Sequence, residues 1–502
     1  VAGAVSTMGS KEIGRRPVSS VVSALDAGIP GLLVNATYGQ PGEDPDIRIR
    51  GFASVNGVNT PLYVVDGVPY SGSLADLNPD DVESVSVLKD ALAAALYGNR
   101  AANGVILITL KQAKSRRLSM EFTVRQGVYV RGIKEYARVG TDDFMEVMWK
   151  SYRNSLLTNN PDAFPTLEEA NRAVNESLIE SFLKYNIYDV PDDQLFDAEG
   201  HLREGVKVRE SIREDLDWFD PLVRKGFRQE YNLSGGAVQE KSDYRFSLGY
   251  LNEEGYLTNA GFDRLNARLQ LNLKPKSWLG SGLTLAGSHQ NQNITDGTGN
   301  TYVNVFNISR YVAPIYPVYL HDLATGEYIL NQSGEKQFDD GTANERPQNA
   351  GRNIVWENNL NRNRRTNTVF SGQAYLSLDL PKGFHLTVKG DLYLANQDRK
   401  AYYSPEVGDG VGVGRAYQYQ YRFKRYVFQE QLRWQRQLGK QEVEVLLGHE
   451  NFNYNYHYTA MSKADQILPD NIAMSNFSTL KTLTGYPKDY RTESYLGTIR
   501  YN

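Results

Sequence analysis

The side chains best suited to covalent or metal chemistry are few in this sequence. There are 6 histidines among 502 residues and no cysteine. His449-Glu450 begins like a zincin motif, but Asn451-Phe452-Asn453 follows, so the second histidine of a zinc hydrolase is missing. The sequence also lacks a Gly-x-Ser-x-Gly segment, which would provide a nucleophile elbow. We therefore expect no enzyme activity, no metal centre and no bound cofactor.

Two acidic turns and one glycine-rich segment carry weaker signals. Asp339-Asp340-Gly341 and Asp296-Gly297 lack the series of ligands of an EF-hand, so we expect solvated turns there rather than calcium sites. Gly408–Gly414 lacks the lysine of a phosphate-binding loop. It is expected to be a flexible connector.

Aromatic side chains are the best candidates for a substrate surface, because sugars stack on aromatic faces and peptides pack against them. Trp356, Tyr402 and Tyr403 are the candidate substrate-binding residues. The tyrosines of Tyr417–Tyr421 alternate with glutamines, which favours an extended strand or the aromatic girdle of a membrane interface.

The composition limits the class of protein. The net charge is -4 and the pI about 6.0, so nothing suggests a nucleic-acid partner. No window approaches 18 apolar residues, which excludes a helical membrane protein. A mean hydropathy of -0.50, with 33 Tyr, 18 Phe and 44 Gly, is still compatible with a membrane barrel, because barrel strands alternate and their loops are polar.

The first 113 residues have the pattern of a small α+β domain. Short apolar or β-branched runs predict strands at Leu62–Val65, Val82–Leu88 and Val105–Leu110. Asn78-Pro79 combines a good helix cap with a proline suited to the first helical position. The alanine-rich segment Asp90–Tyr97 predicts a helix that ends at Gly98.

Five segments of this region form a recognisable series. In order they are Gly39–Gly42 (GQPG), Ile47–Gly51 (IRIRG), Pro61–Gly67 (PLYVVDG), Leu88–Gly98 and Ala102–Thr109 (ANGVILIT). Each segment alone could occur in any α+β domain. Their order and spacing resemble the plug domain of TonB-dependent outer-membrane transporters, and of the SusC/RagA family in particular.

The resemblance implies that this domain fills a barrel lumen and acts as a gate. The signature residues that it assigns to the plug and its gating are Arg48, Arg50, Gly51, Asp66, Gly67, Lys89, Asp90, Gly98, Asn103 and Gly104. Arg48, Arg50 and Asp66 would join polar networks within the plug or between plug and barrel, and these networks must loosen for transport. The alternative for each of the three is a permanently paired structural charge.

The rest of the chain can be tested independently for barrel strands, which need about 9–11 residues to cross a bilayer and alternate apolar and polar residues. In Leu265–Leu273 the leucines and Ala267 share one face, and polar residues occupy the other. Asp243–Asn252 and Phe384–Leu392 repeat the pattern, and Lys389 and Asp391 would point inward. A soluble sandwich also alternates, so this pattern alone does not establish a membrane protein.

The connections between strands are more specific. The expected strands are 119–131, 227–237, 243–252, 263–274, 278–292, 367–380, 383–396, 424–438, 441–456 and 491–502. Short turns alternate with long loops, and the long extracellular ones are expected at 132–226, 293–366, 397–423 and 457–490. This is the alternation of short periplasmic turns and long external loops in outer-membrane barrels.

The first long loop and its return to the sheet carry further signals. Asp142–Asn154 and Leu167–Lys184 are predicted helices, and Thr166 is a candidate cap with Glu169 three residues on. Leu216–Gly226 and Phe246–Gly255 again resemble the SusC family.

The expected fold is a membrane β-barrel with an α+β plug in its lumen. Residues 1–113 would be the plug and 114–502 the first part of the barrel. About ten strands cannot enclose such a plug, whereas plugged transporters have about 22. We therefore expect a piece of a longer protein, without the N-terminal TonB box and with further antiparallel strands elsewhere.

By resemblance, the function is TonB-dependent import of oligosaccharides across the outer membrane of a Gram-negative bacterium. The implied partners are a SusD-like surface lipoprotein, TonB with its inner-membrane energising complex, the substrate and outer-membrane lipid, with a dimer of transporter–lipoprotein pairs as the assembly. Import of peptides by a RagA-like system is one alternative. An open porin and a soluble β-rich protein, either glycan-binding or enzymatic, are the others.

Overall fold

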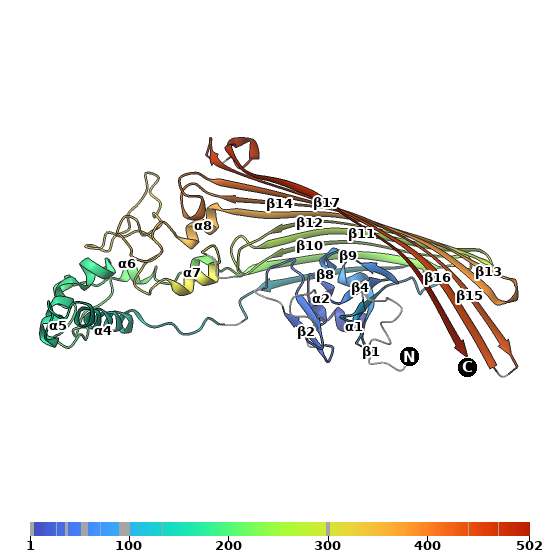
Figure 1. Cartoon of the computed structure of the whole chain (residues 1–502), viewed down its shortest axis with the longest axis horizontal. Coiled ribbons are helices and arrows are strands. Elements are labelled where there is room, and N and C mark those ends of the chain that lie inside the picture. Colours follow the sequence, from blue (N-terminus) through green and yellow to red (C-terminus); the bar gives the residue numbers. More distant parts are fainter. Residues whose placement is uncertain are drawn as a thin grey trace.

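The chain forms a small α+β unit packed against one face of a long antiparallel sheet (Figure 1). The computed structural model describes residues 5–26, 28–35, 39–51, 59–70, 72–89, 101–132, 134–297, 302–439, 441–469 and 471–501. The helix expected at Asp90–Tyr97 lies outside the described residues, and so do Asp90 and Gly98.

The plug is built around a five-stranded sheet of order β1-β6-β7-β4-β5 and a two-stranded sheet β2-β3. Its elements are β1 (Val5–Gly9), α1 (Ser10–Ile13), α2 (Val21–Ala24), β2 (Leu32–Asn35), β3 (Asp46–Ile49), β4 (Leu62–Val65), β5 (Val68–Tyr70), η1 (Leu74–Asp76), η2 (Pro79–Asp81), β6 (Val82–Leu88) and β7 (Val105–Leu110). The predicted strands β4, β6 and β7 are confirmed at their predicted bounds. Asn78 caps η2 as predicted, because its side chain accepts the N–H of Asp80.

The long sheet contains ten strands in sequential order. They are β8 (Ser119–Tyr129), β9 (Gly226–Val238), β10 (Ser242–Glu254), β11 (Gly261–Lys276), β12 (Leu279–Asn293), β13 (Arg362–Leu380), β14 (Phe384–Tyr403), β15 (Arg415–Leu438), β16 (Gln441–Gln466) and β17 (Phe477–Tyr501). All ten predicted strands are present. This sheet and the plug confirm the predicted fold class.

Two predicted loops are wrong in their bounds. Residues 397–423 and 457–490 are mostly strand, because β14 continues to Tyr403, β15 begins at Arg415 and β16–β17 form one long hairpin. β15, β16 and β17 have 24, 26 and 25 residues, well beyond the roughly 9–11 needed to cross a bilayer. Their polar and tyrosine-rich ends suggested loops, but such residues also form strands where both faces of a sheet meet water.

The sheet has an apolar outer face and a polar face toward the plug. On β11, Leu265 is 50% exposed and Leu269 is 46% exposed, whereas Arg264 and Arg268, which point toward the plug, are 1% and 6% exposed. A soluble protein would turn its leucines inward. The alternative of a soluble β-rich protein is therefore wrong, and the outer face suits lipid.

A helical insertion lies at the end of the sheet opposite the short turns (Figure 1). It contains α4 (Thr141–Asn159), α5 (Leu167–Ser177), the π-helical turn η4 (Leu178–Leu183), η5 (Asp192–Gln194), α6 (Glu210–Arg213) and η6 (Asp220–Leu222). Both predicted helices are confirmed, and Thr166 and Glu169 form the predicted capping box. Among the described helices, none is long and apolar enough to cross a membrane.

The remaining short helices lie in the later loops and turns: α7 (Val305–Tyr311), α8 (Ile354–Leu360), η7 (Pro381–Gly383), η8 (Gly408–Gly410) and η9 (Met474–Asn476). The insertion and the loop that carries α7 and α8 share a hydrophobic core around Trp149, Trp218 and Ile315. This core is separate from the core of the plug around Val85, Val87 and Ile106.

Candidate functional site

Several of the signature residues make contacts that hold the plug together. In β3, Nη2 of Arg48 lies 3.6 Å from the Asp46 carboxylate. Nζ of Lys89 donates to Ser6 Oγ at 2.7 Å and to the Pro30 carbonyl at 2.5 Å, and the Asn103 side chain donates to the Thr60 carbonyl at 3.3 Å. These contacts lie within the plug and not between plug and sheet.

The signature glycines relieve backbone strain. Gly51, Gly67 and Gly104 have φ of 99°, 84° and 88°, a region that side chains disfavour. At Gly104 an added Cβ would also lie 2.7 Å from Ile49 Cδ1 and 3.1 Å from the Leu88 carbonyl. Arg50 adopts a left-handed conformation as well, with φ 58°, and its N–H donates to the Gly31 carbonyl at 3.0 Å.

Asp66 joins the plug to the sheet. Its carboxylate accepts the Leu110 N–H at 3.0 Å within the plug and lies 3.7 Å from Nη2 of Arg268 on β11. Its carbonyl accepts a hydrogen bond from Lys389 Nζ of β14 at 2.8 Å. Burial raises the pKa of the Asp66 carboxyl, and the Leu110 hydrogen bond opposes that rise. Asp66 thus contacts the sheet directly through both its side chain and its carbonyl.

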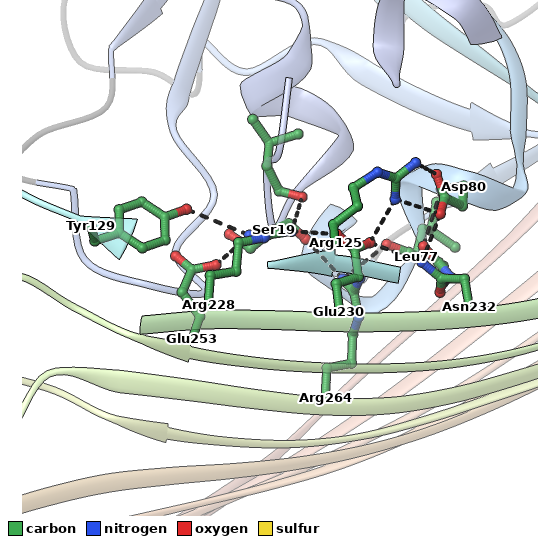
Figure 2. A network of polar contacts seen from close by, with 12 residues as sticks. Ser19, Leu77, Asp80, Arg125, Tyr129, Arg228, Glu230, Asn232, Glu253 and Arg264 are labelled. Atoms are coloured by element: carbon green, nitrogen blue, oxygen red, sulfur yellow. Dashed lines mark hydrogen bonds and ion pairs between the residues drawn. The ribbon is translucent and has the colours of Figure 1, made fainter. Parts of the chain in front are cut away.

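The turn η2 presents a row of acidic and amide groups to β8–β10. Both Nη atoms of Arg125 donate to the Asp80 carboxylate, at 2.7 and 2.9 Å. Asn232 donates to Asp80 at 2.6 Å (Figure 2). Asn232 also accepts a hydrogen bond from Asn78 at 2.8 Å. Ser247 donates to Asp81 at 2.7 Å. This row binds the start of η2 to three neighbouring strands.

Arg264 holds the plug through its main chain. Its Nη1 donates to the carbonyls of Ser19, Ala75 and Leu77 at 2.8, 2.7 and 3.1 Å (Figure 2). These carbonyls come from two segments of the plug that are far apart in sequence. A single buried guanidinium of β11 therefore ties both segments to the sheet.

Arg228 on β9, two strands away, makes a similar contact with the main chain of the plug. Nη2 donates to the Val18 carbonyl at 3.2 Å and to Glu230 at 3.0 Å, and Nη1 donates to Glu253 at 2.6 Å (Figure 2). The two glutamates balance a cation that is otherwise removed from water. Glu230 also lies 3.3 Å from Arg125, so the charged groups of β8–β10 form one connected network.

Asp76 is a hub at the centre of the interface. Its carboxylate accepts hydrogen bonds from Tyr70 at 3.1 Å, Gln290 at 3.0 Å, Asn367 at 2.9 Å and Tyr393 at 3.3 Å. Burial raises the pKa of Asp76 to about 7, although the hydrogen bonds from its neighbours lower it. The hub links η1 and β5 of the plug to β12, β13 and β14.

At β15 the interface between plug and sheet combines one cation with a small apolar contact. Arg425 of β15 donates to the Pro69 carbonyl and, at 2.6 Å, to Asp391. Beside it, Val68 of the plug packs with Val427 and Phe452. The apolar contact is small in comparison with the polar network.

The GQPG segment is also bound to the sheet. Gln40 Nε2 donates to the Asn293 carbonyl at 2.8 Å, and Gln292 Nε2 donates to the Pro41 carbonyl at 2.7 Å. Arg365 pairs with Glu43. Hydrogen bonds and ion pairs therefore bind the plug to strands from β8 to β15, and we call this polar interface the seat of the plug. Water can replace these contacts without any covalent chemistry.

Sequence reasoning missed most of this seat. Alternation placed Asp391 of β14 on the inward face and Arg268 of β11 on the face opposite the leucines, but it could not show what these residues contact. Asp76, Arg264 and Arg425 carried no motif. Arg264 was one of several polar residues on its face of β11, Arg425 was a single cation among aromatic and apolar residues on its face of β15, and Asp76 was a lone acid in a turn of the plug.

The candidate substrate aromatics are not gathered in one place. Trp356 in α8 stacks on Phe338, with ring centroids 5.8 Å apart. Tyr402 and Tyr403 line a hollow of about 1110 Å³ among the loops and strand ends, which Glu357 and Tyr417 also line. Tyr417–Tyr421 lies in β15, as the strand interpretation predicted.

The acidic turn Asp339-Asp340-Gly341 is bonded to protein groups, and the expectation of a solvated turn is wrong for Asp339, which is buried. Asp339 accepts from the Tyr185 hydroxyl at 2.8 Å and from the Gly341 N–H at 2.6 Å, and Asp340 accepts from Thr342. Arg346 donates to the carbonyls of both aspartates. In the part of the chain that is described, no group of three or more His, Cys, Asp or Glu could hold a metal ion.

A plug bound to the polar face of a sheet whose other face is apolar defines a class, the plugged membrane β-barrels. Residues 1–105 match the family model of the TonB-dependent Receptor Plug Domain. TonB-dependent receptor P39 of Formosa agariphila is 26% identical over 59% of this chain and 24% of its own length. TonB-dependent receptor SusC of Bacteroides thetaiotaomicron is 26% identical over 54% of this chain and 22% of its own.

Solved structures give the same fold. The RagAB peptide transporter superposes with a TM-score of 0.76 at 21% identity, over 100% of this chain and 54% of that one. The ferric citrate transporter FecA superposes with a TM-score of 0.56 at 10% identity. The chain thus spans about half of these structures and about a quarter of the curated relatives.

Residues 1–105 are thus the plug domain of the TonB-dependent receptor family, and the chain as a whole is similar to outer-membrane receptors of the SusC and RagA type. It comprises the plug domain and a ten-stranded part of the barrel sheet. The prediction that it is not an enzyme agrees with this family, whose members are transporters.

Proposed function

We propose that this chain is the gate and part of the pore of a TonB-dependent importer that takes up oligosaccharides. The observation that carries the proposal is the polar seat of the plug, in which Arg228, Arg264, Arg268 and Arg425 donate to main-chain carbonyls. Hydrogen bonds of this kind contribute only about 0.5–3 kcal/mol each, because water replaces them when they break. A pull on the plug can therefore release them one by one.

A permanently closed domain would be expected to have a larger apolar interface than two small contacts. Val68 packs with Val427 and Phe452, and Tyr70 packs on the cluster around Val369 and Tyr393. An open porin, the earlier alternative, needs no such seat. We propose Asp66 as the gating contact among the signature residues, because it is bonded both to β7 and to β14. Arg48, Arg50 and Lys89 are proposed to keep the plug intact while it moves.

The partners follow from the same proposal. TonB, driven by its inner-membrane energising complex, would pull the plug from the periplasm, and a SusD-like lipoprotein would cover the pore outside. Two such pairs would form the assembly. Tyr402 and Tyr403, on the wall of the hollow, are the proposed contacts for a sugar, and Trp356 is a more distant candidate. Peptide import is the second candidate, favoured by the fold that the chain shares with the RagAB peptide transporter.

Growth of a deletion strain on single nutrients tests the proposal. We expect the deletion strain to lose growth on one glycan. The wild-type gene should restore this growth in a strain that has TonB, but not in a strain without TonB. Loss of growth on peptides alone would show that the substrate is a peptide, which is the second candidate. Normal growth on every glycan and peptide would refute import.

A further inference from the structure

The inner face of β15–β17 carries a patch of aromatic rings beyond the seat of the plug. Its five rings, the aromatic wall, belong to Tyr421, Phe423, Tyr456, Tyr458 and Tyr486. Neighbouring rings are in contact, with centroids 5.1 Å apart for Tyr421–Tyr458 and Phe423–Tyr456 and 5.3 Å apart for Tyr458–Tyr486. The wall therefore forms one continuous aromatic surface across three strands.

The register shows that the wall faces the lumen. Arg425, which bonds the plug, lies two and four residues from Phe423 and Tyr421 on a strand without a register shift there, so all three share a face. Phe423 packs on the cluster of Val369, Tyr393 and Ala395, against which Tyr70 of the plug also packs. A lipid-interface girdle would occupy the other face.

The wall begins where the seat of the plug ends. Arg425 and Val427 contact the plug, whereas Phe423 and Tyr421 come next along β15 toward the long loops. The same face continues through Tyr419 to Tyr417, about 20 Å from Phe423 at about 3.3 Å per residue. Tyr417 also lines the hollow among the loops. A ligand that enters from outside would meet these rings before it reaches the plug.

We propose that the aromatic wall is a binding track for an extended oligosaccharide. The wall offers broad aromatic faces with phenol hydroxyls at their edges, and Tyr486 is 51% exposed. Pyranose rings present flat C–H faces and hydroxyls at their rims, so they match both features. Arg399 Cζ, 6.0 Å from the ring centroid of Tyr419, and Lys488, between Tyr486 and Tyr490 on β17, flank the track with positive charge.

This inference rests on the proposed import and names the place where the sugar binds. Binding to purified protein needs no TonB. The binding experiment can therefore reject the proposed sugar site without rejecting the proposed import. The test uses the full-length transporter with its lipoprotein in detergent. Isothermal titration calorimetry measures its affinity for neutral oligosaccharides of pyranose units, from starch, xylan and mannan, and for peptides of three to five residues.

The decisive variant combines Tyr421→Leu, Tyr456→Leu and Tyr458→Leu, which removes three rings and keeps apolar strand-forming side chains. Each ring is expected to contribute about two- to tenfold in affinity, so the triple variant should bind the sugar at least about tenfold more weakly. The matched control variant replaces the same three tyrosines by phenylalanine, so it keeps the rings and loses only the hydroxyls. It should bind the sugar within about threefold of wild type. Tyr426→Leu, on the opposite face of β15, should leave the affinity unchanged.

Equal affinity of the leucine variant and wild type would overturn the track. So would an equal loss in the phenylalanine variant, because hydroxyls and not rings would then carry binding. Peptide binding with no sugar binding would overturn the sugar assignment and leave import in place. Melting temperatures of the two triple variants that match wild type, with affinity lost only in the leucine variant, would support the track.

Discussion

Replacing Arg264 by methionine should loosen the plug without unfolding the sheet. The guanidinium donates to three plug carbonyls, and the Ala75 carbonyl keeps a second donor, Gln290 Nε2, at 3.1 Å. The carbonyls of Ser19 and Leu77 then lose this donor, which costs about 1–3 kcal/mol each. The variant also avoids the free-energy cost of removing the charged guanidinium from water, which offsets part of this loss. The net loss of stability should therefore be about 2–4 kcal/mol.

Hydrogen–deuterium exchange measures this effect directly. A loss of about 2–4 kcal/mol in the free energy of local opening corresponds to roughly 30- to 700-fold faster amide exchange. The acceleration should be confined to η1, η2 and the segment around Ser19. Arg264→Lys keeps the charge but not the planar fork, and it should restore only part of the protection.

Leu265→Ala is the matched control, because Leu265 is the next residue of β11 and faces away from the plug. It should leave plug exchange unchanged. Unaltered exchange of η1 and η2 in Arg264→Met would refute the reasoning, since the plug would then be held without the guanidinium. Faster exchange throughout β9–β12 would also refute it, because the sheet rather than the seat would have been damaged.

Three further perturbations test other parts of the molecule. The pKa of Asp76, raised by burial to about 7, means that the folded plug keeps a proton which the unfolded chain has released. Plug stability, measured by exchange, should therefore fall by a few kcal/mol as the pH rises from about 4 to about 7, and Asp76→Asn should remove that dependence. Gly104→Ala should lower plug stability by about 1–3 kcal/mol in denaturant unfolding, whereas Gly51→Ala, with open space around its Cβ, should cost less. Leu269→Arg on the apolar face should cost about 2–4 kcal/mol of barrel stability in lipid, and equal folding of Leu269→Ala and Leu269→Arg in vesicles would argue against a lipid-facing surface.

The strands were predictable because each carries a regular local pattern. β11 alternates leucine with polar residues, and β4, β6 and β7 are short β-branched runs between turns. Periodicity of this kind depends only on neighbouring residues, so one sequence suffices to find it. The same reasoning failed at the ends of β14–β17, where polar and aromatic residues continue as strand beyond the apolar band.

The seat could not be predicted because its contacts join distant residues. Arg264 meets carbonyls 187 to 245 positions away in sequence, and a carbonyl carries no side-chain signal at all. Asp76 resembles any acid in a turn until Gln290, Asn367 and Tyr393 surround it. The face of Tyr421 was undetermined for a related reason, since alternation gives two faces but not which one meets the lumen.

Besides the ion pairs with plug side chains, four arginines of the sheet bind the main chain of the plug. Arg228, Arg264, Arg268 and Arg425 reach carbonyls of Val18, Ser19, Pro69, Ala75, Leu77 and Lys111. Every amino acid supplies the same carbonyl, so substitutions at these six positions keep the grip as long as the path of the chain is unchanged. Plugs of divergent sequence should therefore keep these main-chain contacts in barrels that retain the four arginines, provided that Asp76, Asp80 and Asp81 are also kept for the side-chain contacts. Chimeras of this kind would separate the recognition of cargo from the movement of the gate.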